Sequence, residues 1–357
     1  MRIFYDAQAF VIQHYGGISK YFSELVRELR TYDDIKVRVG CIWTKNQHLR
    51  QVLVGPKWEG RFRGAARLNR TYDRFARIGS DIVHSTFYDP RSLIYVRNKR
   101  HVVTVHDMIP ERFPELFQVN PHLAKREYCE RADLIICISQ QTRKDLLAFY
   151  NIDPKKVVTI YLGVRPQRSN GPSTGTAEDD RYVLFVGDRH SYKNFKIVLE
   201  ALRKLAETDK SISLRLAGGG QITDSERHEI ERRGLQGRVS HVRVDDVSIR
   251  ALYRNALCFV FPSLYEGFGL PMLEAFAEGC PVTLADNPCF REIARDAALY
   301  FDPKDAEACA SAIERGSAFG QERDAMIAHG LELASQYSWA KSASQHVEAY
   351  SRVVTST

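Results

Sequence analysis

Short apolar runs alternate with amphipathic stretches along the first part of the chain. Each run is rich in Val, Ile, Leu or aromatic residues, as expected for a strand that is buried on both faces. The amphipathic stretches predict helices, for example over Gly17–Leu29 and Gln140–Tyr150. Together they predict a parallel sheet covered by helices. Its strands are expected at Arg2–Tyr5, Val37–Ile42, Ile82–His84, His101–Val105, Leu134–Ile138 and Val157–Ile160.

The alternation stops after Gly163 and then resumes. Residues 166–180 are polar and rich in Gly, Pro, Ser and Thr, which is typical of a linker. We therefore predict an α/β protein whose two Rossmann-like domains, residues 1–165 and 181–336, face each other across a cleft at the carboxyl ends of their strands. The second set of strands is expected at Tyr182–Val186, Leu214–Ala217, Val239–Val244, Cys258–Phe261, Pro281–Ala285 and Ala298–Tyr300.

The segment Pro262–Ala275, PSLYEGFGLPMLEA, follows one of these strands directly. Its glycines let the backbone approach a ligand closely, and Pro271 suits the first turn of a helix. The helix N-terminus supplies N–H donors for phosphate or sugar oxygens. Glu266 in the loop and Glu274 in the helix could each hold a pair of hydroxyl groups. The alternative is helix capping with two solvated glutamates.

The same segment resembles the E-x7-E signature of glycosyltransferase family 4. That resemblance implies a GT-B fold of two Rossmann-like domains and a retaining reaction. In the family the first glutamate lies beside the donor sugar and the second binds the ribose, which implies a catalytic role for Glu266 and ribose binding for Glu274. The loop amides that contact the donor sugar and its phosphate correspond to Phe268, Gly269 and Leu270.

Leu184–Phe195, LFVGDRHSYKNF, is similar to the part of the family's donor domain where an arginine and a lysine grip the diphosphate. These positions are Arg189 and Lys193, expected on an exposed loop of the cleft. Fixed cations stabilise the charge that a leaving nucleoside diphosphate gains, and a metal ion would do the same. The alternative is an ordinary basic loop. We expect no metal site and no cofactor, because the acidic pairs have the character of turn or linker residues: Asp33–Asp34, Asp179–Asp180 and Asp245–Asp246.

In the first domain, His14–Tyr21 (HYGGISKY) resembles the family's glycine-rich loop. The resemblance places Gly16 near the donor sugar and Gly17 near its phosphates, although a plain tight turn would have the same residues. His106, at the end of HVVTVHD, matches the family's active-site histidine. Its implied role is to position the sugar or support positive charge, without acting as a nucleophile. Ser139 is expected to cap the following helix.

The amino-acid composition gives the chain a net charge of +7 and a pI near 9.0, which suits an anionic partner. The seven cysteines are scattered and form no CxxC pair, so neither disulfides nor a zinc site is expected. The start of the chain does not read as a signal peptide, and no run reaches the ~18 apolar residues of a membrane span. We expect a cytoplasmic protein, either free or peripheral on the inner face of the membrane.

A basic helix is predicted within residues 60–78. Its arginines recur every three or four residues and form one stripe, while Ala65, Leu68, Tyr72 and Phe75 form another face. The stripe could meet an anionic membrane or a lipid-diphosphate acceptor. Alternatively the apolar face packs on the domain and the arginines are solvated. Nucleic acid is disfavoured, because no binding module accompanies the charge. The stripe consists of Arg63, Arg67, Arg70, Arg74 and Arg77.

The runs GGISKYF, HDMIPERFPELF and GDRHSYKNF are most similar to mannosyl- and deoxymannosyl-transferases of bacterial surface-polysaccharide assembly. This implies a GDP-linked hexose donor and a saccharide acceptor on a lipid, in O-antigen or related synthesis. Val242 stands where the family often has glycine, which leaves the nucleobase open. Residues 337–357 resemble the family's last helix, which returns to the first domain. A sugar-nucleotide epimerase, or a basic binding protein with a decayed site, are the alternatives.

Overall fold

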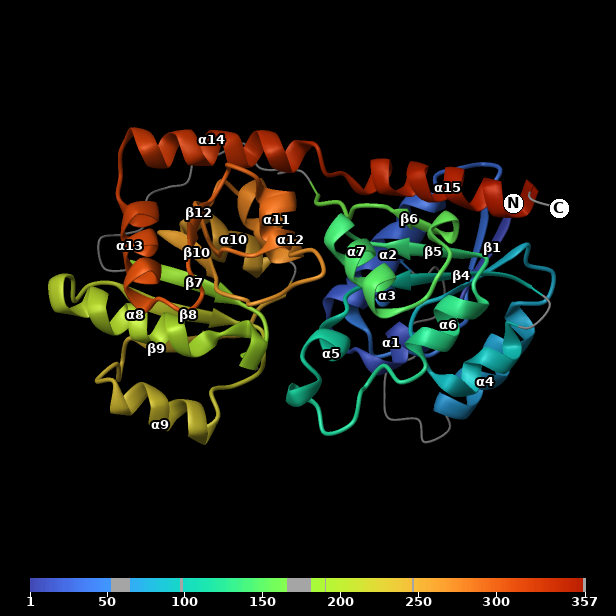
Figure 1. Cartoon of the computed structure of the whole chain (residues 1–357), viewed down its shortest axis with the longest axis horizontal. Coiled ribbons are helices and arrows are strands. Elements are labelled where there is room, and N and C mark those ends of the chain that lie inside the picture. Colours follow the sequence, from blue (N-terminus) through green and yellow to red (C-terminus); the bar gives the residue numbers. More distant parts are fainter. Residues whose placement is uncertain (53–64, 97–98, 166–180, 190, 246, 356–357) are drawn as a thin grey trace. The chain divides into compact units, whose positions relative to one another are not determined.

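The computed structural model describes residues 1–52, 65–96, 99–165, 181–189, 191–245 and 247–355 (Figure 1). They form two compact units. Unit 1 is Met1–Gly163 with Trp339–Thr357, and unit 2 is Val164–Ser338. The predicted linker lies outside the described residues. Within the described ranges, no helix has the length and apolar character required to cross a bilayer.

Unit 1 is built on a six-stranded parallel sheet in the order β2-β1-β3-β4-β5-β6. Every strand in it was expected from the sequence, within two or three residues at each end. Buried side chains such as Phe4, Val83, Val103 and Ile135 form its core. The strands are β1 (Arg2–Tyr5), β2 (Lys36–Val39), β3 (Ile82–Ser85), β4 (Arg100–Val105), β5 (Leu134–Cys137) and β6 (Val157–Thr159).

Helices cover this sheet, and the C-terminal helix α15 (Trp339–Thr355) packs against α2 (Gly17–Leu29). Ser139 caps α7 (Gln140–Phe149) as predicted, since its hydroxyl accepts from Thr142 N. The other helices are α1 (Gln8–Ile12), α3 (Gln47–Val52), α4 (Ala65–Ala76), α5 (Ile109–Arg112), α6 (Lys125–Arg131), α7 (Gln140–Phe149), and the short 3-10 helices η1 (Pro90–Tyr95), η2 (Pro114–Leu116) and η3 (Pro154–Lys156).

Unit 2 repeats the plan with a parallel sheet in the order β12-β11-β10-β7-β8-β9. Val183, Leu214 and Val260 belong to its core. The chain begins in the middle of this sheet and runs first to one edge and then to the other, so the order reverses between β7 and β10. The strands are β7 (Tyr182–Val186), β8 (Ser213–Ala217), β9 (Val239–Val242), β10 (Cys258–Phe261), β11 (Val282–Ala285) and β12 (Leu299–Phe301).

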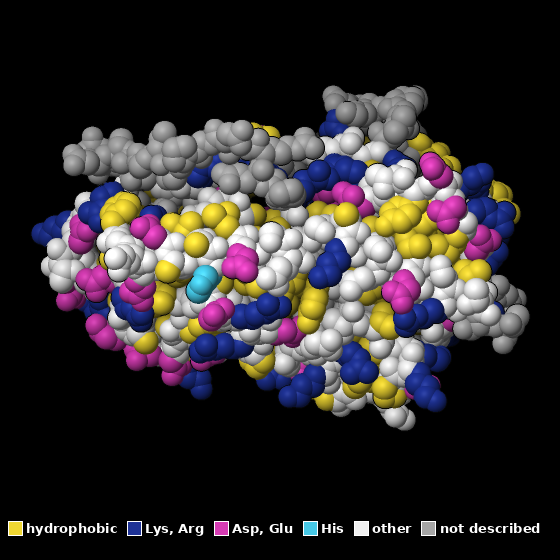
Figure 2. Space-filling model, turned by 90° about the horizontal axis from the view of Figure 1, so that it is seen from above, with side chains coloured by type: hydrophobic (Ala, Val, Ile, Leu, Met, Phe, Trp, Pro, Cys, Tyr) yellow, Lys and Arg dark blue, Asp and Glu magenta, His cyan; other side chains and the backbone are white. Residues whose placement is uncertain are grey.

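The helices of unit 2 connect these strands. Asp245 accepts from Ser248 N and Val247 N at the start of α10 (Ser248–Asn255), so it belongs to a helix-starting turn, as expected. Acidic and basic side chains are interspersed over the face seen in Figure 2. The helices are η4 (Ser191–Lys193), α8 (Phe195–Thr208), α9 (Asp224–Arg232), α10 (Ser248–Asn255), α11 (Leu270–Ala277), α12 (Pro288–Ala294), α13 (Ala306–Ser317) and α14 (Gln321–Ser335).

All seven cysteines are buried free thiols.

The arginine stripe of the basic helix is only partly present at the surface. Arg67 and Arg74 are exposed, but Arg77 is buried and pairs with Asp73. Its guanidinium also lies 5.4 Å from the ring centroid of Phe4, inside the core of unit 1. The prediction that Arg77 belongs to a solvated stripe is therefore wrong. Arg63 and the side chain of Arg70 lie outside what the structure describes.

The alternative, in which the apolar face of α4 packs on the domain, is also wrong. Leu68, Tyr72 and Phe75 are 42%, 36% and 62% exposed. The buried face carries Asn69, whose Oδ1 accepts from the N–H groups of Ile42 and Trp43, together with Asp73, whose Oδ1 accepts from Ala7 N. These loop N–H groups need acceptors when buried, so polar side chains of α4 face inward.

Candidate functional site

The clearest cluster of predicted residues lies where the strand order of unit 2 reverses. The loop after β7 carries Lys193, and the loop after β10 carries Glu266. Lys193 Nζ lies 2.6 Å from Glu266 Oε1, and the two side chains are 15% and 12% exposed. A backbone bond from Leu264 N to Tyr192 O, 2.8 Å long, ties the same loops together. Ligands of open α/β sheets bind at this point of the fold.

Two aromatic rings lie beside the Lys193 ammonium group. Its Nζ lies 5.3 Å from the ring centroid of Tyr192 and 5.5 Å from that of Phe261. Removal of water strengthens the interaction of such a cation with any anion that reaches it. A diphosphate approaching Lys193 would compete with the Glu266 carboxylate for it.

The loop after β10 leads into α11 in the way the motif predicts. Gly269 has a φ of 96°, and a Cβ there would come within 3.1 Å of Met272 Cε and of a Phe290 ring carbon. Only glycine fits this turn without strain. The side chains of Phe268 and Leu270 are buried, so a donor contact at these positions would use their backbone.

Glu274 lies on α11, facing α10. Its Oε2 accepts from the hydroxyl of Tyr253, which is fully buried, at 3.4 Å. The residue as a whole is only half-buried. The helix therefore orients Glu274 while leaving part of it accessible to a ligand.

Arg189 does not lie on an exposed loop, contrary to expectation. Its side chain is 3% exposed, and its Nε donates to Glu226 Oε1 at 2.6 Å. Its terminal nitrogens donate to the carbonyl oxygens of four successive residues, Gly218 to Gln221, at 3.0 to 3.2 Å. In this structure the guanidinium holds a loop. Its predicted contact with the diphosphate would require some of these hydrogen bonds to be replaced by bonds to phosphate oxygens.

The loop that Arg189 holds is a glycine turn at the carboxyl end of β8. Gly218, Gly219 and Gly220 have φ values of 79°, 65° and 75°. A Cβ on Gly219 would lie 2.7 Å from Gly187 O and 2.8 Å from an Arg189 nitrogen. The packing of Arg189 against this turn therefore requires glycine at position 219. Sequence reasoning missed this turn, although the run of three glycines after an apolar strand is a visible signal.

In unit 1, the glycine-rich loop leads into α2 as predicted. Gln13 Oε1 accepts from Ser19 N at 3.0 Å and so occupies one of the N–H donors at the helix start. A Cβ on Gly16 would lie 2.6 Å from that oxygen, whereas a Cβ on Gly17 would meet no atom within 4 Å. Gly17 is thus the position with open space for a ligand.

His106 follows β4 and is 8% exposed. Its ring meets the rings of Tyr21 and Phe22 edge to face, with centroids 5.3 Å and 5.7 Å apart. Its Nε2 is buried and has no hydrogen-bond partner among the described residues. Burial lowers the pKa of His106 to about 3, so the ring is neutral near pH 7. A neutral imidazole here can position a hydroxyl but carries no charge of its own.

The residue after His106 is held by a buried lysine that sequence reasoning missed. Lys125 Nζ donates to Asp107 O at 3.0 Å and to Glu111 Oε2 at 2.8 Å, and its side chain is fully buried. Burial raises the pKa of Asp107, but nearby Lys125 and His122 outweigh this and leave the pKa lowered. The loop bearing His106 is therefore fixed by charge as well as packing. Nothing in the helical pattern around Lys125 marks it as buried.

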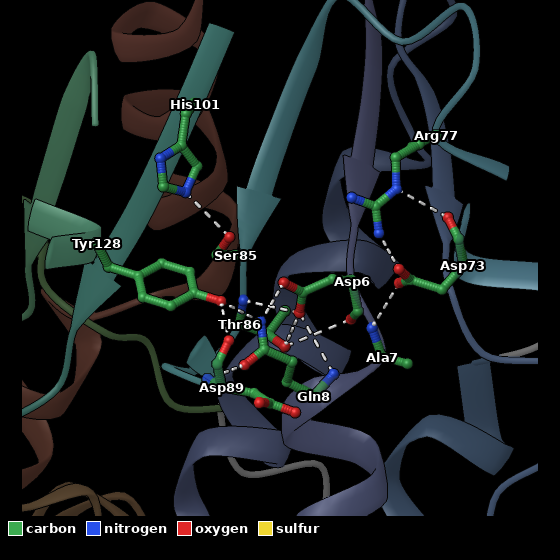
Figure 3. A network of polar contacts seen from close by, with 10 residues as sticks. All are labelled: Asp6, Ala7, Gln8, Asp73, Arg77, Ser85, Thr86, Asp89, His101 and Tyr128. Atoms are coloured by element: carbon green, nitrogen blue, oxygen red, sulfur yellow. Dashed lines mark hydrogen bonds and ion pairs between the residues drawn. The ribbon is translucent and has the colours of Figure 1, made fainter. Parts of the chain in front are cut away.

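A second missed group lies where the strand order of unit 1 reverses, between β1 and β3 (Figure 3). Asp6 Oδ1 accepts from Thr86 N at 3.0 Å and Thr86 Oγ1 at 2.6 Å, and Asp6 Oδ2 accepts from Gln8 Nε2 at 2.7 Å. Gln8 Oε1 in turn accepts from Asp89 N. Burial raises the pKa of Asp6, while these donors favour its ionised form. The network joins the two loops at the crevice of the sheet.

In the part of the chain that the structure describes, no three or more His, Cys, Asp or Glu side chains are arranged to hold a metal ion. Asp179–Asp180 and Asp246 lie outside the described residues. Metal independence stays a prediction.

Two family models match the chain. "Glycosyltransferase Family 4" matches residues 15–168, and "Glycosyl transferases group 1" matches residues 167–332. O-antigen chain mannosyltransferase B of Escherichia coli is 29% identical over 279 residues, which cover 74% of this chain and 73% of that protein. O-antigen chain mannosyltransferase RfbU of Salmonella typhimurium is 27% identical over 60% of each chain.

Solved structures show the same fold at lower sequence identity. HepE of Anabaena, in complex with UDP and glucose, has a TM-score of 0.75 at 17% identity, covering 98% of this chain and 99% of its own. Sucrose-phosphate synthase of Thermosynechococcus elongatus has a TM-score of 0.74 at 20% identity, covering both chains fully. The two parallel sheets and these matches confirm the predicted fold class.

Proposed function

Because the chain belongs to the family 4 and group 1 glycosyltransferases of the GT-B fold, we propose that it is a retaining, metal-independent hexosyltransferase. It moves a sugar from a nucleoside diphosphate to a saccharide acceptor. The observation that carries the proposal is the pairing of Lys193 with Glu266 at the strand-order reversal of unit 2. A cation and a carboxylate fixed side by side suit a diphosphate next to a sugar.

The described residues can supply the chemistry without a nucleophile from the protein. Lys193 stabilises the charge that the diphosphate gains as the glycosidic bond breaks. Glu266 faces the positive charge that develops on the sugar. In unit 1, His106 is neutral near pH 7 because its pKa is lowered to about 3, and its proposed role is to position a hydroxyl group. The acceptor attacks from the face that the diphosphate leaves, and the leaving phosphate takes the acceptor proton. The sugar anomer is retained.

The relatives support a proposal for the donor and the acceptor. Mannosyltransferases of O-antigen synthesis are similar to the chain, which favours a GDP-linked mannose or deoxymannose donor and a lipid-linked saccharide acceptor on the cytoplasmic side. HepE, a more distant relative in sequence, binds UDP. UDP-glucose is therefore the necessary competitor in any test of the donor.

An anionic membrane surface is proposed as the place where the acceptor is met. Leu68, Tyr72 and Phe75 form an exposed apolar face on α4, with Arg67 and Arg74 exposed beside it. An apolar face flanked by arginines can lie in the headgroup region, and each arginine near anionic lipid contributes about 1 kcal/mol.

Sedimentation with vesicles tests this contact. The wild-type protein should bind phosphatidylglycerol vesicles, and the Phe75→Glu variant should bind them more weakly. Phe319→Glu is the matched control, because Phe319 is 74% exposed but lies in unit 2. Equal loss of binding in both variants, or equal binding to neutral phosphatidylcholine vesicles, would contradict the proposal that α4 binds an anionic membrane.

The donor is tested by thermal shift with GDP-mannose, a GDP-deoxyhexose, UDP-glucose and UDP-N-acetylglucosamine. A donor that binds the folded protein at 100 times its Kd adds about 2.7 kcal/mol of stability. We expect GDP-mannose to raise Tm in the wild type and in Lys204→Ala, but much less in Lys193→Ala. Lys204 is a matched control because it pairs with Glu307 on the helical surface.

The other outcomes separate the alternatives. Conversion of one sugar nucleotide into another without release of nucleoside diphosphate would indicate an epimerase. No shift with any sugar nucleotide, together with vesicle binding, would indicate a binding protein with a decayed site. Proton NMR of the product shows directly whether the donor anomer is retained.

A further inference from the structure

A chain of buried hydrogen bonds joins the C-terminal helix to three strands of unit 1. The hydroxyl of Tyr350 on α15 lies 2.8 Å from that of Tyr5 on β1 and 2.6 Å from His84 Nδ1 on β3. His84 Nε2 lies 2.9 Å from Thr104 Oγ1 on β4. All four side chains are at most 1% exposed.

The chain continues through α2 and returns to α15. The hydroxyl of Tyr21 on α2 lies 3.3 Å from Thr104 Oγ1 and 2.7 Å from His346 Nε2. His346 Nδ1 lies 2.7 Å from the carbonyl oxygen of Ser342, one turn earlier in α15. The chain thus holds α15 at two points and ends on a backbone carbonyl.

That carbonyl sets the direction of the chain. An oxygen of this kind only accepts, so His346 carries its proton on Nδ1. Burial lowers the pKa of His346 to about 4 and that of His84 well below its usual value, so both rings are neutral near pH 7. His346 Nε2 must therefore accept from the hydroxyl of Tyr21.

The donor and acceptor of each remaining hydrogen bond can then be assigned in turn. The oxygen of Tyr21 accepts from the Thr104 hydroxyl, because its own proton is already used. Thr104 Oγ1 then accepts from His84 Nε2–H, which leaves His84 Nδ1 to accept from Tyr350. The oxygen of Tyr350 accepts from Tyr5. Each hydroxyl donates once, and the two imidazoles are opposite tautomers.

Tyr21 is also a ring against which His106 packs. The two ring planes meet at 84°, with centroids 5.3 Å apart. Because His106 Nε2 has no hydrogen-bond partner in the described part of the chain, ring contacts rather than a bond at this atom orient the imidazole. The hydroxyl of Tyr21 is fixed from two sides, by the donor Thr104 and the acceptor His346.

We propose that Tyr21 is a positioning residue for His106, and that the C-terminal helix holds Tyr21 in place through His346. The role of His106 in this statement rests on the proposed function. The direction of the hydrogen-bond chain does not. The two parts can therefore fail separately.

Imidazole nitrogen NMR on the full chain, labelled with ¹⁵N-histidine, tests the direction at pH 7. We expect the proton of His84 on Nε2 and that of His346 on Nδ1. The opposite tautomer at either ring would contradict the direction given above for the hydrogen-bond chain. Ring signals are assigned with the variants His84→Gln, His106→Gln and His346→Gln.

A matched pair of variants tests the positioning role. Tyr21→Phe and Tyr5→Phe each remove one buried hydroxyl from the chain, but only Tyr21 touches His106. The ring signals of His106 should shift or broaden in Tyr21→Phe and stay unchanged in Tyr5→Phe. Equal signals in the two variants would show that the hydroxyl of Tyr21 has a structural role alone.

Kinetics give the functional readout, as GDP released from GDP-mannose. Turnover should fall about tenfold or more in Tyr21→Phe with little change in KM, because small displacements of a positioned group cost that much. Tyr5→Phe should stay near the wild-type rate, and both variants should lower Tm by similar amounts. Equal turnover in the two variants overturns the positioning role. Normal turnover in His106→Gln would instead remove the role of His106 itself.

Discussion

Lys193 and Glu266 are each other's partners: the ammonium nitrogen lies 2.6 Å from the carboxylate oxygen, across the strand-order reversal of unit 2. The residue expected at the diphosphate and the residue expected at the sugar thus share one ion pair. Each holds the other in place before a donor arrives, which reduces the ordering that donor binding requires.

Lys193→Ala should lower turnover by about two to three orders of magnitude, the scale for losing one fixed charge-stabilising donor. The side chain is 15% exposed and pairs with one carboxylate, so the fold should persist. Steady-state kinetics beside circular dichroism measure both effects. Lys204→Ala should behave as wild type. Near-normal turnover in Lys193→Ala would remove the diphosphate assignment.

Arg189→Ala should differ from Lys193→Ala by also destabilising unit 2. The guanidinium binds Glu226 and the carbonyl oxygens of the glycine turn, and these groups would lose their partner. A hydrogen bond to a charged group contributes about 1.5–3 kcal/mol. Urea unfolding should show the loss, together with reduced turnover. An unchanged midpoint in urea would mean that the glycine turn does not depend on Arg189.

The two carboxylates should separate in binding and kinetics. Glu274→Gln keeps the shape but loses a charged acceptor at the predicted ribose position, so free nucleoside diphosphate should bind more weakly by about 1.5–3 kcal/mol. Glu266→Gln should lower turnover and barely change that affinity, because the free diphosphate has no sugar. Calorimetry with GDP, beside kinetics with GDP-mannose, measures both. The reverse pattern would mean that the roles are exchanged.

Activity should survive an excess of EDTA, because Lys193 and the start of α11 already supply positive charge at the predicted diphosphate position. The assay compares initial rates before and after chelation and after addition of manganese or magnesium. A rate that is lost in EDTA and restored by either ion would show that the acidic residues of the chain were misread.

Acid should destabilise unit 1 through its buried histidines. The pKa of His346 is lowered to about 4 in the folded protein, whereas the unfolded chain titrates near 6.5. Below pH 6.5 the unfolded state binds more protons, so stability falls as the pH falls toward 4. His346 alone accounts for up to about 2 kcal/mol between pH 7 and 5, at 1.36 kcal/mol per pKa unit.

Urea unfolding at pH 7 and pH 5 measures this effect. The difference between the two pH values should shrink in His346→Gln. It should persist in His14→Gln, because that histidine is exposed in the same unit. An equal pH dependence in both variants would show that His346 is not a source of the acid sensitivity.

The sequence by itself was sufficient for the strands and the fold class. Runs such as Cys258–Phe261 are apolar throughout, because strands of a covered parallel sheet are buried on both faces, and this signal is local. The turn at Gly269 and the cap at Ser139 are also local, since each depends on backbone conformation within a few residues. The loop motif and its two glutamates could therefore be found without coordinates.

Which partner a side chain takes was decided only by the tertiary structure. Arg189 and Lys193 were equivalent cations in the sequence, yet one is bound by the glycine turn and the other by Glu266, because neighbouring strands bring different loops to each. Arg77 is buried because Asp73 faces the core, and Lys125 because Glu111 lies beside it. A buried charge needs a counter-charge beside it. Spacing along the sequence does not reveal which distant residue supplies that counter-charge, or which face of a helix lies against the core.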